Sequence, residues 1–361
     1  MSVSVEAAVG ARTDRLVGLL AERELDCLLV TNLANVRYLT GFTGTNGACI
    51  VSSDERLFLT DFRYVEQARS QVQGYERVEA GRDMVGDLAG RLRGRAGFDD
   101  AHMTVELHRK LGEKVAEGVE LVSAGGLVER LREVKDELEL DAIRAAAEIA
   151  NEAYEELRER GLAGRTERDV ALTLTRSLED RGAEGASFPA IVAAGPHGAL
   201  AHAVPRDVEI PRGTLVVIDM GAQVDGYCSD CTRTLATGEL DDEAQEVYEL
   251  VLRAQSESLA AARAGAECKA VDAVARELID AAGHEKHFGH GLGHGVGLEI
   301  HEDPRLGKTA EGTLVTGNAV TIEPGVYLPE RVGVRIEDLV IVSDGEPEIL
   351  TGFPKELVTV G

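Results

Sequence analysis

The sequence predicts two domains, a smaller α/β domain at the N-terminus and an α+β domain after it. The length of 361 residues suits two domains that each bury a core of their own. Helical and extended patterns alternate over residues 1–130, whereas later the long amphipathic helices are grouped apart from the extended segments. A Gly-Gly pair precedes a long helical pattern, and we place the boundary near Glu133, which gives domains 1–132 and 133–361.

In the N-terminal domain, helical spacing of apolar residues alternates with short apolar runs that suit buried strands. The helices are expected over 12–23, 64–71, 84–92 and 111–117, and the strands over 26–31, 48–52 and 57–60. A turn at 53–55 joins the last two strands. This alternation of β and α units is typical of a compact α/β domain.

The second domain opens on a helical pattern that runs nearly unbroken over 127–160, supported by Glu and Arg residues three and four apart. Two further amphipathic helices are expected over 242–264 and 270–282. The extended segments occupy 215–222, 227–235, 319–328 and 332–342. Helices that are grouped apart from antiparallel strands indicate an α+β domain.

The chain carries 64 acidic and 38 basic residues, a formal net charge of −26. A nucleic-acid binder needs a basic surface, so this charge excludes that class of partner, and it disfavours anionic membranes too. No apolar run reaches the roughly 20 residues that cross a bilayer. Residues 1–10 also lack the basic flank and apolar stretch of a signal peptide. We therefore expect a cytoplasmic protein.

The basic residues comprise seven lysines against 31 arginines. An acid excess with few lysines is typical of proteins adapted to high salt, because carboxylates repel strongly when salt does not screen them. The sequence therefore favours a halophilic protein over an acidic protein from an ordinary cell. The five cysteines are scattered, and Cys228 and Cys231 form a C-x-x-C in a strand-like segment with no second pair. This context favours a structural role over zinc or redox chemistry.

The segment LVVIDMGAQVDGYCSDCTRTL at 215–235 is a candidate hairpin that carries two aspartates, and its Asp-Gly at 225–226 is a turn signal. With a loop of two or of four residues, position 219 pairs with an even-numbered position. Asp219 and Asp230 then share one face, about 5–8 Å apart. Asp219 follows an apolar run typical of a buried strand, and burying two unpaired carboxylates is costly. A cation between the two carboxylates would remove this repulsion.

A second candidate hairpin joins AVTIEPGVYL at 319–328 to VGVRIEDLVIV at 332–342. With an odd-length loop centred on Glu330, Glu323 falls opposite Glu337, and both lie among apolar strand residues. One buried pair of carboxylates is as compatible with a structural role as with a ligand role. Two such pairs in one domain favour a metal site.

The segment FGHGLGHGVGLEIHE at 288–302 alternates glycines with His290 and His294. Glycine lets the backbone approach a crowded centre, so that an imidazole can reach the carboxylates. Two Asp, two Glu and one His suit two divalent ions, Mn²⁺ first and Co²⁺ or Zn²⁺ as alternatives. Two such ions about 3.5–4 Å apart generate hydroxide at neutral pH. His202, in a loop after Phe188, either faces a substrate or is simply exposed.

In this order, IDMGAQVDGYCSDCTRT, GHGLGHGVGLEIHE, TIEPGVY and GVRIED resemble the signature of a metallopeptidase family. That family contains Xaa-Pro aminopeptidase, Xaa-Pro dipeptidase and methionine aminopeptidase. The resemblance implies an α+β pita-bread catalytic domain over 133–361. NVRYLTGF at 35–42 and TDFRY at 60–64 resemble the smaller α/β creatinase/prolidase-type N-terminal domain. Methionine aminopeptidases typically lack this domain, so the aminopeptidase P and prolidase branch is favoured.

The resemblance implies a role for each carboxylate and for one histidine. Asp219 would chelate one metal ion, and His294 and Glu323 would chelate the other. Asp230 and Glu337 would bridge the two ions. The family residue that matches Glu323 also shuttles a proton from the nucleophilic water to the leaving nitrogen.

The resemblance also implies roles for residues around the ligands. His202 and His301 would lie near the substrate and stabilise the tetrahedral intermediate. His290 and Arg335 match positions next to the ligands, where Arg335 could orient carboxylates through charge-assisted hydrogen bonds. A structural ion pair between Arg335 and Asp338 is the alternative for that arginine.

The expected activity is hydrolysis of the Xaa-Pro bond in dipeptides, or at the N-terminus of peptides, by a metal-bridging hydroxide. The substrates would be small peptides with proline at the second position, and the resemblance implies a homodimer. The sequence leaves open whether the enzyme is a dipeptidase or an aminopeptidase. A creatinase-like hydrolase or a non-catalytic binding protein on the same fold is the alternative, and both would lack ligands that this chain retains.

Overall fold

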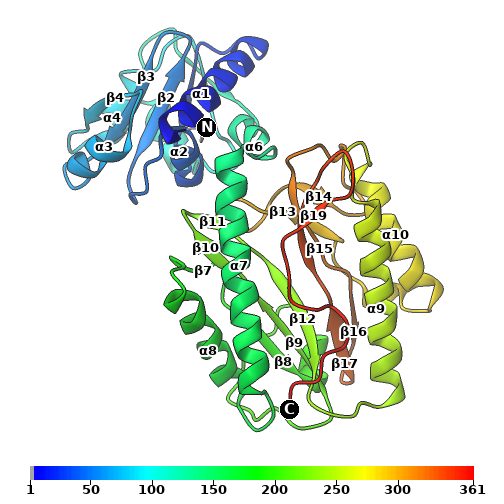
Figure 1. Ribbon diagram of the computed structural model, residues 1–361. Coiled ribbons are helices and arrows are strands. Elements are labelled where there is room, and N and C mark those ends of the chain that lie inside the picture. The colour runs from blue at the N-terminus through cyan, green and yellow to red at the C-terminus, as the bar shows by residue number, and fades with distance from the viewer. Residues whose placement is uncertain (1–3) are drawn as a thin grey trace. The chain divides into compact units, whose positions relative to one another are not determined.

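The computed structural model describes residues 4–361, and the chain divides into two compact units, Met1–Arg132 and Glu133–Gly361 (Figure 1). Each unit has hydrophobic clusters of its own. Among the described residues, no helix combines the length and the apolar character that a membrane span requires. The cysteines all lie in the described part of the chain, where each is buried and none forms a disulfide.

The N-terminal unit is a mixed sheet with the strand order β4-β3-β2-β1-β5-β6, flanked by helices. The strands are β1 (Cys27–Val30), β2 (Ala48–Ser52), β3 (Arg56–Thr60), β4 (Glu76–Glu79), β5 (Arg95–Phe98) and β6 (Glu120–Ser123). The helices are α1 (Val5–Glu22), α2 (Leu33–Thr40), α3 (Val65–Gln71), α4 (Met84–Ala89), α5 (Val105–Gly112) and α6 (Leu127–Arg132). The α/β expectation is confirmed for this unit.

Two helix predictions fail and one helix was not predicted, and capping residues explain each difference. The helix expected over 111–117 is wrong, because α5 begins after Thr104, whose hydroxyl accepts from the Leu107 N–H. The sequence reading missed α2, which begins after an Asn32 cap. The helix expected to run through 127–160 is interrupted: Asp136 caps a new helix, α7 (Glu137–Arg160), in a capping box with Glu139.

The second unit contains two main sheets and a hairpin, with strand orders β12-β9-β8, β14-β13-β15-β18-β19 and β16-β17. These strands are β8 (Ile191–Ala194), β9 (Leu215–Met220), β12 (Cys231–Ala236), β13 (Gly293–Gly295), β14 (Glu302–Leu306), β15 (Ala319–Ile322), β16 (Gly325–Leu328), β17 (Val332–Arg335), β18 (Asp338–Ile341) and β19 (Glu348–Ile349). Short strands β7 (Gly185–Ala186), β10 (Ala222–Val224) and β11 (Tyr227–Cys228) form a further small sheet.

Two helix pairs cover these strands from opposite sides (Figure 1). Helices α7 and α8 (Glu167–Asp180) pack on β8, β9 and β12 through residues such as Tyr154 and Ile218. Helices α9 (Asp242–Ala261) and α10 (Cys268–Ala281) pack on β15 to β18 through residues such as Val251 and Val320. Because side chains alternate along a strand, the faces turned away from the helices are free to carry polar residues.

The strand registers place the carboxylates as the two hairpins predict. Asp219 pairs with Thr232, an even-numbered position, so Asp230 lies diagonally across on the same side. Ile322 pairs with Asp338 in one ladder and Gly325 with Arg335 in the next. In both ladders the paired residues are equally far along the chain from Glu330. Glu323 therefore stands opposite Glu337 at the point where the two ladders meet.

Candidate metal centre

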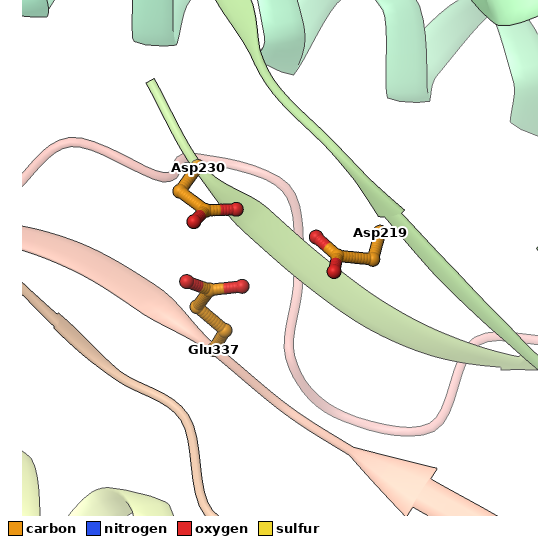
Figure 2. Close-up of side chains that lie close together, drawn as sticks. All are labelled: Asp219, Asp230 and Glu337. Atoms are coloured by element: carbon orange, nitrogen blue, oxygen red, sulfur yellow. The ribbon is translucent and has the colours of Figure 1, made fainter. Parts of the chain in front are cut away.

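Three buried carboxylates converge at the centre of the second unit. Asp219 lies near the end of β9, Asp230 immediately before β12, and Glu337 between β17 and β18. Ligand oxygens from the three side chains all lie within 4.8 Å of one another. Figure 2 shows the carboxylates pointing toward one another from these separate segments. The side chains are nearly inaccessible to solvent, with Glu337 only 1% exposed.

Each of these carboxylates has one buried oxygen that accepts no hydrogen bond from the described residues: Asp219 Oδ1, Asp230 Oδ1 and Glu337 Oε1. Burial, together with the neighbouring carboxylates, raises the pKa of Asp230 and of Glu337 well above the ordinary values. Burial also raises the pKa of Asp219, although Arg335 opposes that effect. Orphaned, mutually repelling oxygens are the donor set that hard divalent cations require, so these residues fit metal ions.

His294 and Glu323 extend this carboxylate cluster. The Nε2 atom of His294 lies 3.7 Å from Asp230 Oδ2 and 3.2 Å from Glu323 Oε1. Its Nδ1 lies 3.0 Å from the Gly295 carbonyl oxygen, a contact that places the proton on Nδ1 and leaves Nε2 free to coordinate. Burial alone would raise the pKa of Glu323, but its hydrogen-bonding contact with His294 and the nearby His290 and Arg335 lower it to about 2.

The glycines beside His294 permit this close approach. A Cβ added to Gly293 would lie 1.9 Å from the Thr321 carbonyl oxygen, and one added to Gly295 would lie 2.3 Å from the Asp303 carbonyl oxygen. Any side chain at either position would therefore push the strand away from its neighbours. The glycine-rich segment thus brings the imidazole to the cluster in the way that its sequence predicts.

Arg335 orients the cluster through a set of hydrogen bonds. Its Nη2 donates to Asp219 Oδ2 at 2.8 Å, and its Nε donates to Thr232 Oγ1 at 3.0 Å. The Thr232 hydroxyl in turn donates to Glu337 Oε2 at 2.8 Å. The suggested ion pair between Arg335 and Asp338 is wrong. The side chain of Asp338 points to the opposite face of the strand, away from Arg335, and pairs there with Arg233 and Lys355.

The predicted histidines line one cavity of about 1580 Å³ together with the carboxylates. His290 Nε2 lies 3.0 Å from the hydroxyl of Tyr327, which accepts a hydrogen bond from Arg335. The ring of His301 contacts the ring of His294 edge-on, with centroids 4.4 Å apart. Burial lowers the pKa of both His290 and His301, which keeps them neutral near neutral pH. His202 reaches the cavity from an exposed loop. The structure thus brings together every residue predicted for the site.

The sequence reading missed three residues of this site. Thr232 shares a strand face with Asp230, and Tyr327 shares one with Glu323, so the period of two residues along a strand could have identified both. Tyr154 had no local signal. It reaches from α7 and places its hydroxyl 2.8 Å from the Ile218 carbonyl oxygen and 2.9 Å from that of Cys231, next to two ligand positions.

Comparison with known proteins identifies the family. A model of metallopeptidase family M24 matches residues 141–344, and a model of the creatinase/prolidase N-terminal domain matches residues 12–134. This chain belongs to metallopeptidase family M24. It is a prolidase-like metallopeptidase of that family, with a pita-bread catalytic domain after a creatinase-type N-terminal domain, as the sequence predicts. Members of the family use divalent metals.

Similar proteins span nearly the whole chain. The Xaa-Pro dipeptidase of Pyrococcus furiosus is 35% identical and covers 96% of this chain and 99% of its own. Among solved structures, the Xaa-Pro dipeptidase from Bacillus anthracis is 38% identical, with a TM-score of 0.93 over 97% of this chain and 99% of its own. The X-Pro aminopeptidase from Thermotoga maritima is 35% identical, with a TM-score of 0.88 over 97% of this chain and all of its own.

Proposed function

We propose that this M24 peptidase hydrolyses the bond before proline in small peptides, using two divalent metal ions, with Mn²⁺ expected first. The observation that carries the proposal is the group of buried, unpaired carboxylate oxygens of Asp219, Asp230 and Glu337. The full-length similarity to proteins named Xaa-Pro dipeptidase supports the proline specificity. A creatinase-like reaction or a non-catalytic role is disfavoured, because neither would need this set of ligands.

In the proposed site, Asp219 would hold one ion and His294 and Glu323 the other, while Asp230 and Glu337 would supply carboxylates to both. Such ions, when bound, activate water and polarise a carbonyl group. Thr232 holds the Glu337 carboxylate in place, and Arg335 holds that of Asp219, each by a hydrogen bond. These contacts would preserve the arrangement of the ligands while a substrate binds.

Proton transfers in the reaction are assigned to residues of the chain. The carboxylate of Glu323 accepts a hydrogen bond from Thr321 at 3.0 Å and is anionic, so it can take a proton from the attacking water. It then passes the proton to the proline nitrogen as the bond breaks. His202 and His301 face the same cavity and donate hydrogen bonds to the carbonyl oxygen as negative charge develops.

We favour a dipeptidase over an aminopeptidase. Lys286, Arg305 and Lys308 line the cavity, and Arg305 lies near enough to His301 to help lower the pKa of that histidine. A cation beside the catalytic histidine suits the free carboxylate of a dipeptide. The cavity volume of about 1580 Å³ would also admit longer peptides, which keeps aminopeptidase activity as the second candidate.

The decisive experiment compares Ala-Pro with Ala-Pro-Ala, with Mn²⁺ and after exhaustive chelation and dialysis. We expect cleavage of Ala-Pro that chelation abolishes and Mn²⁺ restores. Full activity of the chelated protein would contradict the metal mechanism, and a preference for Ala-Pro-Ala would identify an aminopeptidase. Arg305→Ala should raise KM for Ala-Pro more than for Ala-Pro-Ala, whereas the exposed Lys269→Ala should change neither. The expected homodimer is tested separately by sedimentation.

A further inference from the structure

Outside the metal centre, a densely bonded carboxylate belongs to Glu167, the first residue of α8. It is 1% exposed. It accepts hydrogen bonds from the N–H of Ala194 at 3.0 Å and from the N–H of Arg206 at 2.9 Å. The guanidinium of Arg206 donates twice more, from Nε at 3.1 Å and Nη2 at 3.0 Å. The Nδ1 atom of His197 lies 3.0 Å away.

These partners are the two ends of a single loop. Ala194 is the last residue of β8, and Arg206 follows directly on the segment 201–205, which lines the cavity and includes His202. His197 lies on the short 3₁₀ helix between them. The buried carboxylate of Glu167 therefore holds both ends of the loop that carries His202.

Other contacts hold the middle of this loop, among them the packing of buried Ala203 against Ile191 and Ala193. Arg335 Nη1 donates to the Ala201 carbonyl oxygen at 3.1 Å, and Gly198 packs closely against Gly333. His202 itself is exposed, and Val204 is 77% exposed. The position of the His202 ring therefore depends on the two held ends of the loop together with these contacts at its middle.

Glu167 remains charged at neutral pH in spite of its burial. Burial alone would raise its pKa, but the bonds from Arg206, Ala194 and His197 outweigh that effect and lower it. Because ionised partners strengthen hydrogen bonds, an anionic Glu167 holds the loop ends more firmly than a neutral residue of the same shape would.

We propose that Glu167 is a positioning residue for the Xaa-Pro peptidase reaction: through Arg206 and His197 it sets the place of His202 in the cavity. It does so without contact to substrate or metal. This inference rests on the proposed function, because it assumes that His202 assists the reaction.

The test is a double-mutant cycle. Arg206→Ala and Glu167→Gln are each made in the parent protein and in a His202→Ala background, and kcat and KM for Ala-Pro are measured at saturating Mn²⁺. In the parent we expect kcat to fall about 10- to 100-fold, since a misplacement of about 1 Å costs that much, while KM changes less than about threefold. In the His202→Ala background the further loss should be under about threefold, because the residue being positioned is absent.

The matched control is Arg144→Ala, which removes an ion pair with Glu348 of similar 2.8 Å geometry outside the cavity lining. This variant should keep the parental rate in both backgrounds. Equal losses in both backgrounds, or an unchanged kcat for Arg206→Ala, would overturn the proposal. If Glu167→Gln fails to fold, Arg206→Ala alone decides the test. The Arg206 side chain is 47% exposed, so the fold should tolerate its loss.

Amide hydrogen exchange separates this inference from the proposed function. Residues 195–205 should exchange faster in Arg206→Ala than in the parent, with no change in Arg144→Ala. A parent protein that cleaves no Xaa-Pro peptide would refute the function, while faster exchange would still support the fastening of the loop. Unchanged exchange at 195–205 would refute the fastening even in an active enzyme.

Discussion

At the scale of single residues, the hydroxyl of Thr232 links two parts of the centre. It accepts from Arg335 Nε at 3.0 Å and donates to Glu337 Oε2 at 2.8 Å. A hydroxyl that both accepts and donates fixes the rotation of the carboxylate and leaves its other oxygen free for a cation. The side chain is fully buried, so water cannot replace it.

Thr232→Val should weaken metal binding by about 10- to 100-fold, the usual cost of losing a hydrogen bond to a metal ligand. The free energy of unfolding should fall by about 1–3 kcal/mol, because the buried Arg335 Nε and Glu337 Oε2 lose a partner. Titration of the metal-free protein with Mn²⁺, followed by calorimetry, measures the first effect, and denaturant unfolding measures the second.

Thr234→Val is the matched control for this prediction. Its hydroxyl lies on the same strand, is equally buried, and donates to the Arg335 carbonyl oxygen at 2.8 Å. It should lower stability to a similar degree and leave the Mn²⁺ affinity within about twofold of the parent. Equal loss of metal affinity in both variants would mean that Thr232 supports only the fold.

Asp230→Asn should have opposite effects on stability and activity. Burial and three neighbouring carboxylates disfavour its charge, so the metal-free variant should melt at a higher temperature than the metal-free parent. Turnover should fall at least about 100-fold, because losing a direct ligand should cost more than the roughly 10- to 100-fold that the loss of an indirect contact costs. Thermal melts with chelator and with Mn²⁺ measure the stability of the metal-free and the metal-loaded protein. A metal-free variant that melts below the parent contradicts the idea of repulsion.

At the scale of secondary structure elements, the hairpins were predictable because their information is local. Asp225 takes a positive φ of 47° at its turn and Glu330 one of 62°, and alternation along each strand then determines which side chains share a face. The pairing of Asp219 with Thr232 and the opposition of Glu323 and Glu337 follow from those turns.

Helix α8 also had a local signal that the sequence reading overlooked. Val170, Leu174 and Leu178 recur every four residues and are all buried, and Thr166 caps the helix. Contacts between distant segments had no such signal. The bonds from Tyr154 to β9 and β12, and from Glu167 to both ends of the His202 loop, depend on packing of segments far apart in sequence. No pattern within one segment could predict them.

The N-terminus of α8 makes a prediction about pH. The folded-state pKa of Glu167 is lowered, so its contribution to stability is complete above the ordinary glutamate pKa of about 4.3 and is lost as pH falls through the lower folded value. In metal-free protein, the stability difference between the parent and Glu167→Gln should therefore be largest near pH 7 and shrink below about pH 4.3. Urea unfolding from pH 7 to pH 3 measures it. A stability difference that stays constant with pH would show that the charge of Glu167 does not stabilise the fold.

At the scale of the whole molecule, the net charge of −26 opposes the compact state. Salt reduces the Debye length from about 10 Å at 0.1 M to about 3 Å at 1 M, which weakens repulsion between surface carboxylates. We therefore expect the melting temperature to rise as KCl increases from 0.1 M into the molar range, in both the metal-free and the Mn²⁺-loaded protein. A flat or falling curve would remove the halophilic interpretation.

The proposed ligands are spread along the chain from Asp219 to Glu337, and only the folded domain gathers them. An unfolded chain would hold its ions weakly, so metal binding would favour the native state by mass action. Each tenfold rise in free metal above the dissociation constant then adds about 1.4 kcal/mol of stability. A cell short of the metal would accordingly hold more unfolded chain for its proteases to degrade, and the amount of this peptidase would follow the metal supply.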